Sequence, residues 1–65
     1  MKEIITEINR IMLRGYYDDY RLIVTPRHVE LKLIPIQDFN KEVVWLIPNT
    51  KEQKQMLYWQ LNEQY

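Results

Sequence analysis

The spacing of the apolar residues changes twice along the chain, and this change limits the fold more than any other feature of the sequence. Residues 2–14 repeat apolar side chains every three or four positions, which is the period of an amphipathic helix. Residues 20–34 alternate apolar and polar side chains, as half-buried strands do. The helical period returns over 51–64. The chain is therefore predicted to be an α+β protein with a helix at each end.

The first predicted helix, residues 2–14, carries one apolar stripe. The members of this stripe are Ile4, Ile5, Ile8, Ile11 and Met12. Polar residues of the segment, Glu7 and Arg10 among them, are expected on the other side. Arg10 and Arg14 lie in the last turns, where positive charge suits the helix dipole. Gly15 is predicted to end the helix, because glycine adopts the left-handed conformation without a steric penalty.

Two strands are predicted to form a hairpin on either side of the turn at residues 25–28. Pro26 has the fixed φ angle that the second position of a type I turn needs. Pairing across this turn matches apolar residues in three pairs: Val24 with Val29, Leu22 with Leu31, and Tyr20 with Leu33. All six side chains then fall on one face, as the register of a half-buried sheet requires.

A polar loop is expected over residues 37–41, followed by a third strand over 42–47. In this strand Val43, Trp45 and Ile47 alternate with Val44 and Leu46. We place Trp45 in the core, but the pattern leaves open which sheet face Val44 and Leu46 occupy. Pro48 stops the strand, and Thr50 with Gln53 fits a capping box that opens the closing helix over 51–64.

The simplest assembly of these elements is a single small α+β domain spanning residues 1–65. Its order is α-β-β-β-α, with a three-stranded antiparallel meander and two helices packed on one face. The predicted core is Ile4, Ile8, Ile11, Leu22, Val24, Val29, Leu31, Leu33, Trp45, Leu57 and Leu61. A chain of this length buries only roughly 60% of its unfolded surface, so its core is marginal. Without cysteine for disulfides, self-association is the remaining common source of stability.

Composition argues against catalysis and against a membrane location. The chain has no cysteine, no serine and one glycine, so it lacks thiol and serine nucleophiles and a glycine-rich phosphate loop. The single histidine, His28, is expected at the hairpin turn, pointing away from the core and without a nearby nucleophile. We predict no enzymatic activity, no catalytic residues, no cofactor and no metal ion. No apolar run approaches ~18 residues and no signal pattern opens the chain, which predicts a cytoplasmic protein.

Surplus apolar residues predict a protein-interaction module. Outward-facing positions of the sheet and of the closing helix supply the predicted partner-binding residues Ile23, Ile34, Val44, Leu46, Met56 and Trp59. The partner is expected to be another protein or a second copy, giving a homodimer. Two alternatives stay open: the helices could straddle the sheet, and Trp59 could cap the edge of the core. A chain of this size without serine, alanine or cysteine resembles small accessory or inhibitor proteins of phages and mobile elements.

Nucleic-acid binding is the alternative function. The α-β-β-β-α order and the length are similar to those of a double-stranded-RNA-binding domain, in which lysines at the start of the closing helix meet phosphates. Lys51 and Lys54 occupy comparable places. However, Glu52 stands between these lysines, residues 25–28 do not reproduce the basic motif of that family, and nine acidic residues balance nine basic ones. A broad positive field is therefore absent.

Overall fold

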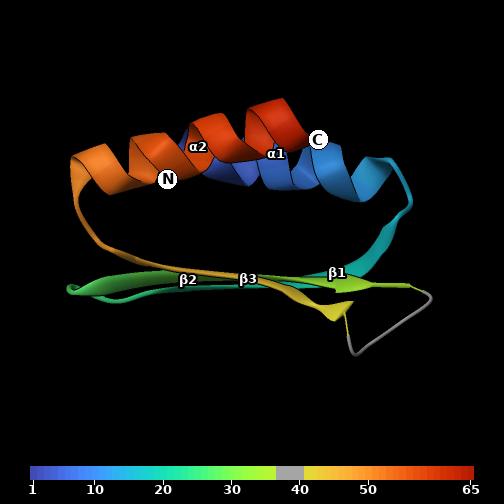
Figure 1. Cartoon of the computed structure of the whole chain (residues 1–65), viewed down its shortest axis with the longest axis horizontal. Coiled ribbons are helices and arrows are strands. Elements are labelled where there is room, and N and C mark those ends of the chain that lie inside the picture. The colour runs from blue at the N-terminus through green and yellow to red at the C-terminus, as the bar shows by residue number, and fades with distance from the viewer. Residues whose placement is uncertain (37–40) are drawn as a thin grey trace.

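Two helices lie on one side of a three-stranded antiparallel sheet (Figure 1). The computed structural model describes residues 1–36 and 41–65. In chain order the elements are α1 (Lys2–Leu13), β1 (Tyr17–Val24), β2 (His28–Pro35), β3 (Val43–Pro48) and α2 (Lys51–Gln64). The sheet has the order β1-β2-β3. The predicted α+β fold with the order α-β-β-β-α is confirmed, and most of the predicted loop over 37–41 lies outside the described residues.

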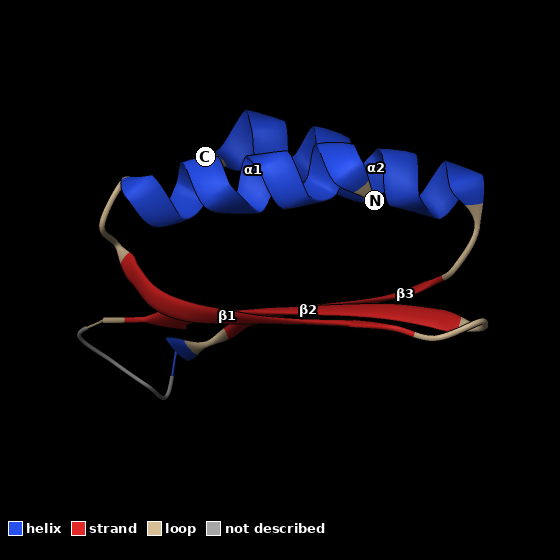
Figure 2. Ribbon diagram, turned by 180° about the vertical axis from the view of Figure 1, so that it is seen from behind, coloured by secondary structure: helices blue, strands red, loops and turns tan. Residues whose placement is uncertain are grey.

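The two helices run parallel, side by side over the sheet (Figure 2). Every connection in the chain reverses its direction, and three strands separate the helices, so α2 ends up pointing the same way as α1. Contacts between the helices agree with this arrangement. Glu7 and Arg10 of α1 reach the last turn of α2, whereas the first turn of α1 lines a cavity with the first turns of α2. Both amino-terminal helix ends therefore lie at one end of the molecule.

The core lies between the helix pair and the central strand. Its fully buried apolar residues are Ile4, Ile8 and Ile11 of α1, Val29, Leu31 and Leu33 of β2, and Leu57 and Leu61 of α2. The predicted hairpin register is confirmed, and β3 continues it by pairing Trp45 with Leu31. Because β2 has a strand on each side, its helix-facing residues are completely covered. Leu22 and Trp45 lie on edge strands and are only half-buried.

Three predicted positions need correction. Val24 was expected in the core, but it is 49% exposed, because it lies on an edge strand at the hairpin end. Ile5 is exposed as well, since the buried stripe of α1 is narrower than the apolar pattern indicates. Glu7 was expected on the solvent side and is only 8% exposed. The reason is that α1 has two neighbours, the sheet below and α2 at its side, so a second strip of its surface is covered.

Most of the residues that were predicted to end or begin a helix or strand do so in the structure. Gly15 has a φ of 81° and follows Arg14, the C-cap of α1. The Thr50 hydroxyl accepts a hydrogen bond of 3.2 Å from the Gln53 amide as the N-cap of α2. In the hairpin, the Thr25 amide donates to the His28 carbonyl (2.8 Å) and the His28 amide donates to the Thr25 hydroxyl (2.9 Å). β1 begins at Tyr17, three residues before the predicted start, because an irregularity in the pairing interrupts the alternation there.

Candidate functional site

The sheet surface opposite the helices, which we call the outer face, is covered by no described helix. Its residues are Asp19, Arg21 and Ile23 of β1, Glu30, Lys32 and Ile34 of β2, and Val44 and Leu46 of β3, with His28 and Pro48 at its hairpin end. Ile23, Val44 and Leu46 are exposed, Leu46 to 63%, and Ile34 is half-buried. The question left open for β3 is resolved: because Val43, Trp45 and Ile47 pair with the buried residues of β2, both Val44 and Leu46 point outward.

Charged side chains occupy the middle of the outer face. The register forms one row from Ile23, Glu30 and Leu46, and the next row from Arg21, Lys32 and Val44. The Lys32 ammonium lies 3.8 Å from a Glu30 carboxylate oxygen, with both side chains partly exposed. A loose ion pair of this kind contributes about 0–1 kcal/mol to folding. The outer face therefore combines apolar borders with opposite charges that remain free to take other partners.

A second surface lies between the first halves of the two helices, and we call it the N-terminal groove. It encloses about 480 Å³ and is lined by Met1, Glu3 and Ile4 of the α1 end and by Lys51, Lys54, Gln55, Tyr58 and Trp59 of α2. Trp59 is 53% exposed, and its ring meets that of Tyr58 edge-on, with centroids 5.7 Å apart. Among residues 1–36 and 41–65, neither Lys51 nor Lys54 forms an ion pair.

The six predicted partner-binding residues thus fall on two separate surfaces. Ile23, Ile34, Val44 and Leu46 share the outer face, whereas Trp59 and Met56 belong to the helix layer on the other side of the sheet. Trp59 lies in the N-terminal groove together with Lys51 and Lys54, the residues predicted for the nucleic-acid alternative. Met56 is exposed but does not line the groove.

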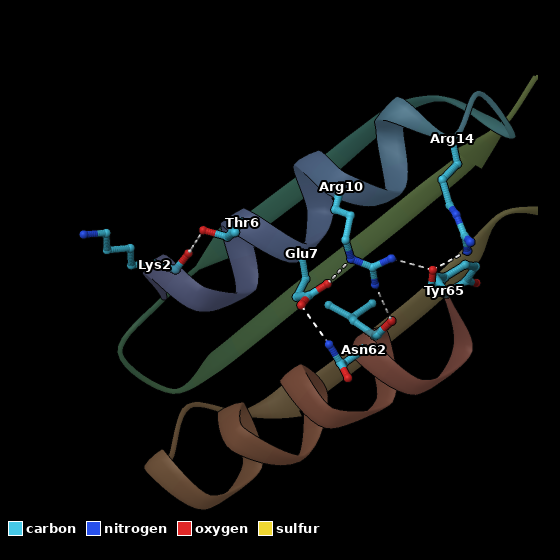
Figure 3. A network of polar contacts seen from close by, with 8 residues as sticks. Lys2, Thr6, Glu7, Arg10, Arg14, Asn62 and Tyr65 are labelled. Atoms are coloured by element: carbon cyan, nitrogen blue, oxygen red, sulfur yellow. Dashed lines mark hydrogen bonds and ion pairs between the residues drawn. The ribbon is translucent and has the colours of Figure 1, made fainter.

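At the other end of the helix pair, a network of polar contacts closes the space between α1 and α2 (Figure 3). Glu7 accepts hydrogen bonds from the Arg10 guanidinium (2.6 Å) and from the Asn62 amide (3.0 Å). Arg10 also donates to the carbonyl oxygens of Tyr65 (2.6 Å) and Leu61 (3.5 Å), and Arg14 donates to that of Tyr65. Arg10 lies in the last turn of α1, as the sequence predicted, and the guanidinium groups also reach across to Leu61 of α2 and to Tyr65, the residue that follows α2.

The environment of the network shifts two pKa values. The hydrogen bond from Asn62, and next to it the one from Arg10, lower the pKa of the Glu7 carboxyl because they stabilise its charged form. Burial raises the pKa of Tyr65, whose hydroxyl accepts a 2.9 Å hydrogen bond from Tyr17. Within residues 1–36 and 41–65, no buried side-chain nitrogen or oxygen lacks a hydrogen-bond partner. The network therefore joins the helices and leaves no group poised for chemistry.

The described residues offer no further chemical site. In residues 1–36 and 41–65, no three side chains of His, Asp or Glu come close enough together to hold a metal ion. His28 is exposed at the hairpin end and does not line the groove. Within this described part, neither helix has the length and apolar character needed to cross a bilayer.

Comparison with known proteins finds no matching family model, curated protein or solved structure. The function therefore has to be argued from the chain's own surfaces. Two of them combine exposed apolar or aromatic side chains with charged groups that are loosely paired or unpaired in the described chain: the outer face and the N-terminal groove.

Proposed function

We propose that this protein is a protein-interaction module whose outer face pairs with the outer face of a second copy. The observation that carries this proposal is a sheet surface without helix cover in the described chain, bordered by the exposed side chains of Ile23, Val44 and Leu46. Exposed apolar patches bordered by charge commonly mark association sites. A second copy would also add buried apolar area to a chain whose own core is marginal.

The charges of the outer face favour a second copy over an unrelated partner. In a two-fold dimer each contact occurs twice, so the face must be complementary to itself. A two-fold axis that runs across the strands, between the rows of Glu30 and Lys32, sets each Glu30 against Lys32 of the second copy. The same axis sets Leu46 against Val44, and Ile23 against Arg21. A two-fold axis along the strands would instead set Glu30 against Glu30 and Lys32 against Lys32 of the second copy. Repulsion between these like charges favours the axis across the strands.

The size of the outer face sets the expected affinity. Eight residues of β2 at ~3.3 Å each give a length of about 26 Å, and three strands spaced ~4.8 Å apart give a width of about 14 Å. The product is about 360 Å² per copy and about 730 Å² for the two copies, below the ~1,000 Å² of stable specific interfaces and typical of weak, transient ones. We therefore expect a dissociation constant on the order of micromolar, so that association depends on protein concentration.

Sedimentation equilibrium over about 1–500 μM tests this proposal. Glu30→Lys should weaken the dimer on the order of tenfold or more, because it opposes like charges in both copies. The exchanged variant Glu30→Lys with Lys32→Glu should recover the dimer, since the pattern stays self-complementary. Leu13→Glu is the matched control, as Leu13 is 88% exposed and lies outside the outer face.

Two results would contradict the proposal. The first is a wild-type chain that stays monomeric over the whole concentration range. The second is a dimer whose dissociation constant is the same in the wild type and in Glu30→Lys. Circular dichroism of each variant separates a lost interface from a lost fold.

A further inference from the structure

The N-terminal groove combines two kinds of binding group that the outer face lacks: lysines without an ion-pair partner in residues 1–36 and 41–65, and an open indole ring. We infer that this groove binds a nucleoside phosphate, with the base against Trp59 and the phosphate between Lys51 and Lys54. The ligand could be a free nucleotide or one unit of a single-stranded nucleic acid, because both present the same chemistry. This inference does not depend on the dimer, since the groove and the outer face lie on different layers.

The electrostatics of the groove favour an anion. Two lysines and a single glutamate, Glu3, are the charged residues of the lining, and the described chain gives these lysines no ion-pair partner. Both helices also begin at this groove, so the positive ends of two helix dipoles add to the potential. The first turn of α1 has no side-chain cap, which leaves its amide donors without a protein side chain to bond.

The hairpin tip adds another cation to this end of the molecule. The Asn49 amide donates to the Arg27 carbonyl (2.9 Å), and the Asn49 side chain donates to the Thr25 carbonyl (2.7 Å). These bonds fasten the tip to the segment that leads directly into Lys51. The exposed side chain of Arg27 therefore starts close to the beginning of α2, where it can reach a second phosphate of a strand that continues beyond the groove.

The aromatic part of the lining selects a flat ring. Trp59 keeps half of its surface exposed, and the edge-on contact with Tyr58 supports the indole from one side. Nucleobases stack on such exposed rings with little dependence on sequence. Gln55 lies in the same lining and carries an amide that can donate to and accept from the edge of a base. The volume of about 480 Å³ is in the range of small-ligand sites and suits one nucleotide.

An acidic peptide would satisfy the lysines but would leave the exposed ring of Trp59 without a matching group. The combination of a flat aromatic surface and separate cations is the one that single-strand binding sites use. On these grounds the nucleoside phosphate is the better match to the lining. Competition by polyglutamate provides the direct comparison between the two ligand classes.

The experiment follows the two indole N–H signals by NMR while mixed mononucleotides, or a single-stranded oligonucleotide of mixed sequence, are added at low salt. The Trp59 signal should shift with the ligand, and the Trp45 signal should stay, because Trp45 packs against the core. An oligonucleotide that binds at least tenfold tighter than the mononucleotides would identify a nucleic-acid strand as the ligand. Equal affinities would identify the free nucleotide.

Variants test each part of the groove. Trp59→Leu should weaken binding about tenfold through lost stacking, whereas Tyr16→Leu, an exposed aromatic outside the groove, should not. Lys51→Gln with Lys54→Gln should reduce the slope of log affinity against log salt by about 1.4 for a single strand. Lys41→Gln is the charge control, and Glu3→Gln should strengthen binding.

The inference fails if neither ligand shifts the Trp59 signal at millimolar concentration, or if polyglutamate displaces the oligonucleotide as well as another oligonucleotide does. Repeating the titration with Glu30→Lys keeps the two proposals apart. This variant changes only the outer face, so groove binding should persist in it whether or not the wild type forms dimers.

Discussion

The two ends of the helix pair differ in how they are held together. At the carboxyl-terminal end, Glu7 and Asn62 bond side chain to side chain, and Arg10 and Arg14 donate to the last carbonyl groups of α2. At the amino-terminal end, no hydrogen bond within the described residues links the two helices, and the N-terminal groove opens between them. Hydrogen bonds between its own polar groups close the carboxyl-terminal end. At the amino-terminal end, the polar groups of the N-terminal groove remain available to a ligand.

Because the two helices are parallel, the like poles of their dipoles meet at each end of the pair, with opposite sign at the two ends. The carboxyl-terminal ends bring together the negative poles of both dipoles, and the two arginines of α1 compensate for them. The amino-terminal ends bring together the positive poles, where Lys51 and Lys54 add more positive charge and Glu3 alone opposes it among the groove residues. The closed end therefore contributes stability, and the open end has the potential to attract an anion.

The largest effect is expected from breaking the closed end with Arg10→Met. This change removes the guanidinium from one oxygen of the buried Glu7 carboxylate, whereas the carbonyl oxygens of Leu61 and Tyr65 keep the Tyr65 amide and Arg14 as donors. Unsatisfied buried groups cost about 1–3 kcal/mol of the free energy of unfolding. Urea denaturation measures the loss, with Arg14→Met as control, because the exposed Arg14 should contribute about 0.5 kcal/mol or less. Equal losses of unfolding free energy in Arg10→Met and Arg14→Met would mean that the burial of Glu7 does not increase the cost of removing its partner.

A smaller effect should appear in the pH dependence of stability. The pKa of Glu7 is lower in the folded chain than its ordinary value of 4.5, so the unfolded chain binds more protons as the pH falls below 4.5. The contribution of Glu7 is complete above that pH and is lost as the pH falls through the folded pKa. Asn62→Leu removes the first cause of the lowered pKa and should flatten the acid limb of the urea midpoint plotted against pH. An unchanged limb in Asn62→Leu would argue against this hydrogen bond.

The smallest effect on stability is expected at the open end. Lys54→Gln should change the free energy of unfolding by no more than about 0.5 kcal/mol, because Lys54 has no ion-pair partner within the described chain. Thermal unfolding compared with Lys41→Gln, an exposed control, checks this value. A clear destabilisation by Lys54→Gln alone would show that the lysine supports the fold, and the contrast between the two ends would then be lost.

The features that depend on residues close together along the chain could be predicted from the sequence alone. The alternation over 20–34 and the turn at 25–28 predicted the pairs Val24–Val29 and Leu22–Leu31, which the structure contains. Gly15 and Thr50 marked the end of α1 and the start of α2. These signals suffice because the backbone angles of turns and caps, and the period of a strand, are set by a few adjacent residues.

The candidate site was predicted only in part. The sequence predicted that Ile23, Ile34 and an outward-facing Val44 or Leu46 share the sheet face away from the helices. The grouping of Trp59 with Lys51 and Lys54 in one groove was not predicted. Grouping depends on which segments become neighbours in space. For β3 this meant its register with β2, which decided that Val44 and Leu46 both point outward. The intervening loop gave no sequence signal for that register.

The packing of the two helices against each other could not be predicted from the sequence pattern. The bond between Glu7 and Asn62 joins residues that are 55 positions apart, and no period or motif in the sequence relates them. The same packing covered Glu7, exposed Ile5 and left the N-terminal groove open. An amphipathic pattern predicts which side of a helix is buried. It does not state which other helix lies beside it, because that choice is made by the shape and charge of two surfaces brought together by the sheet.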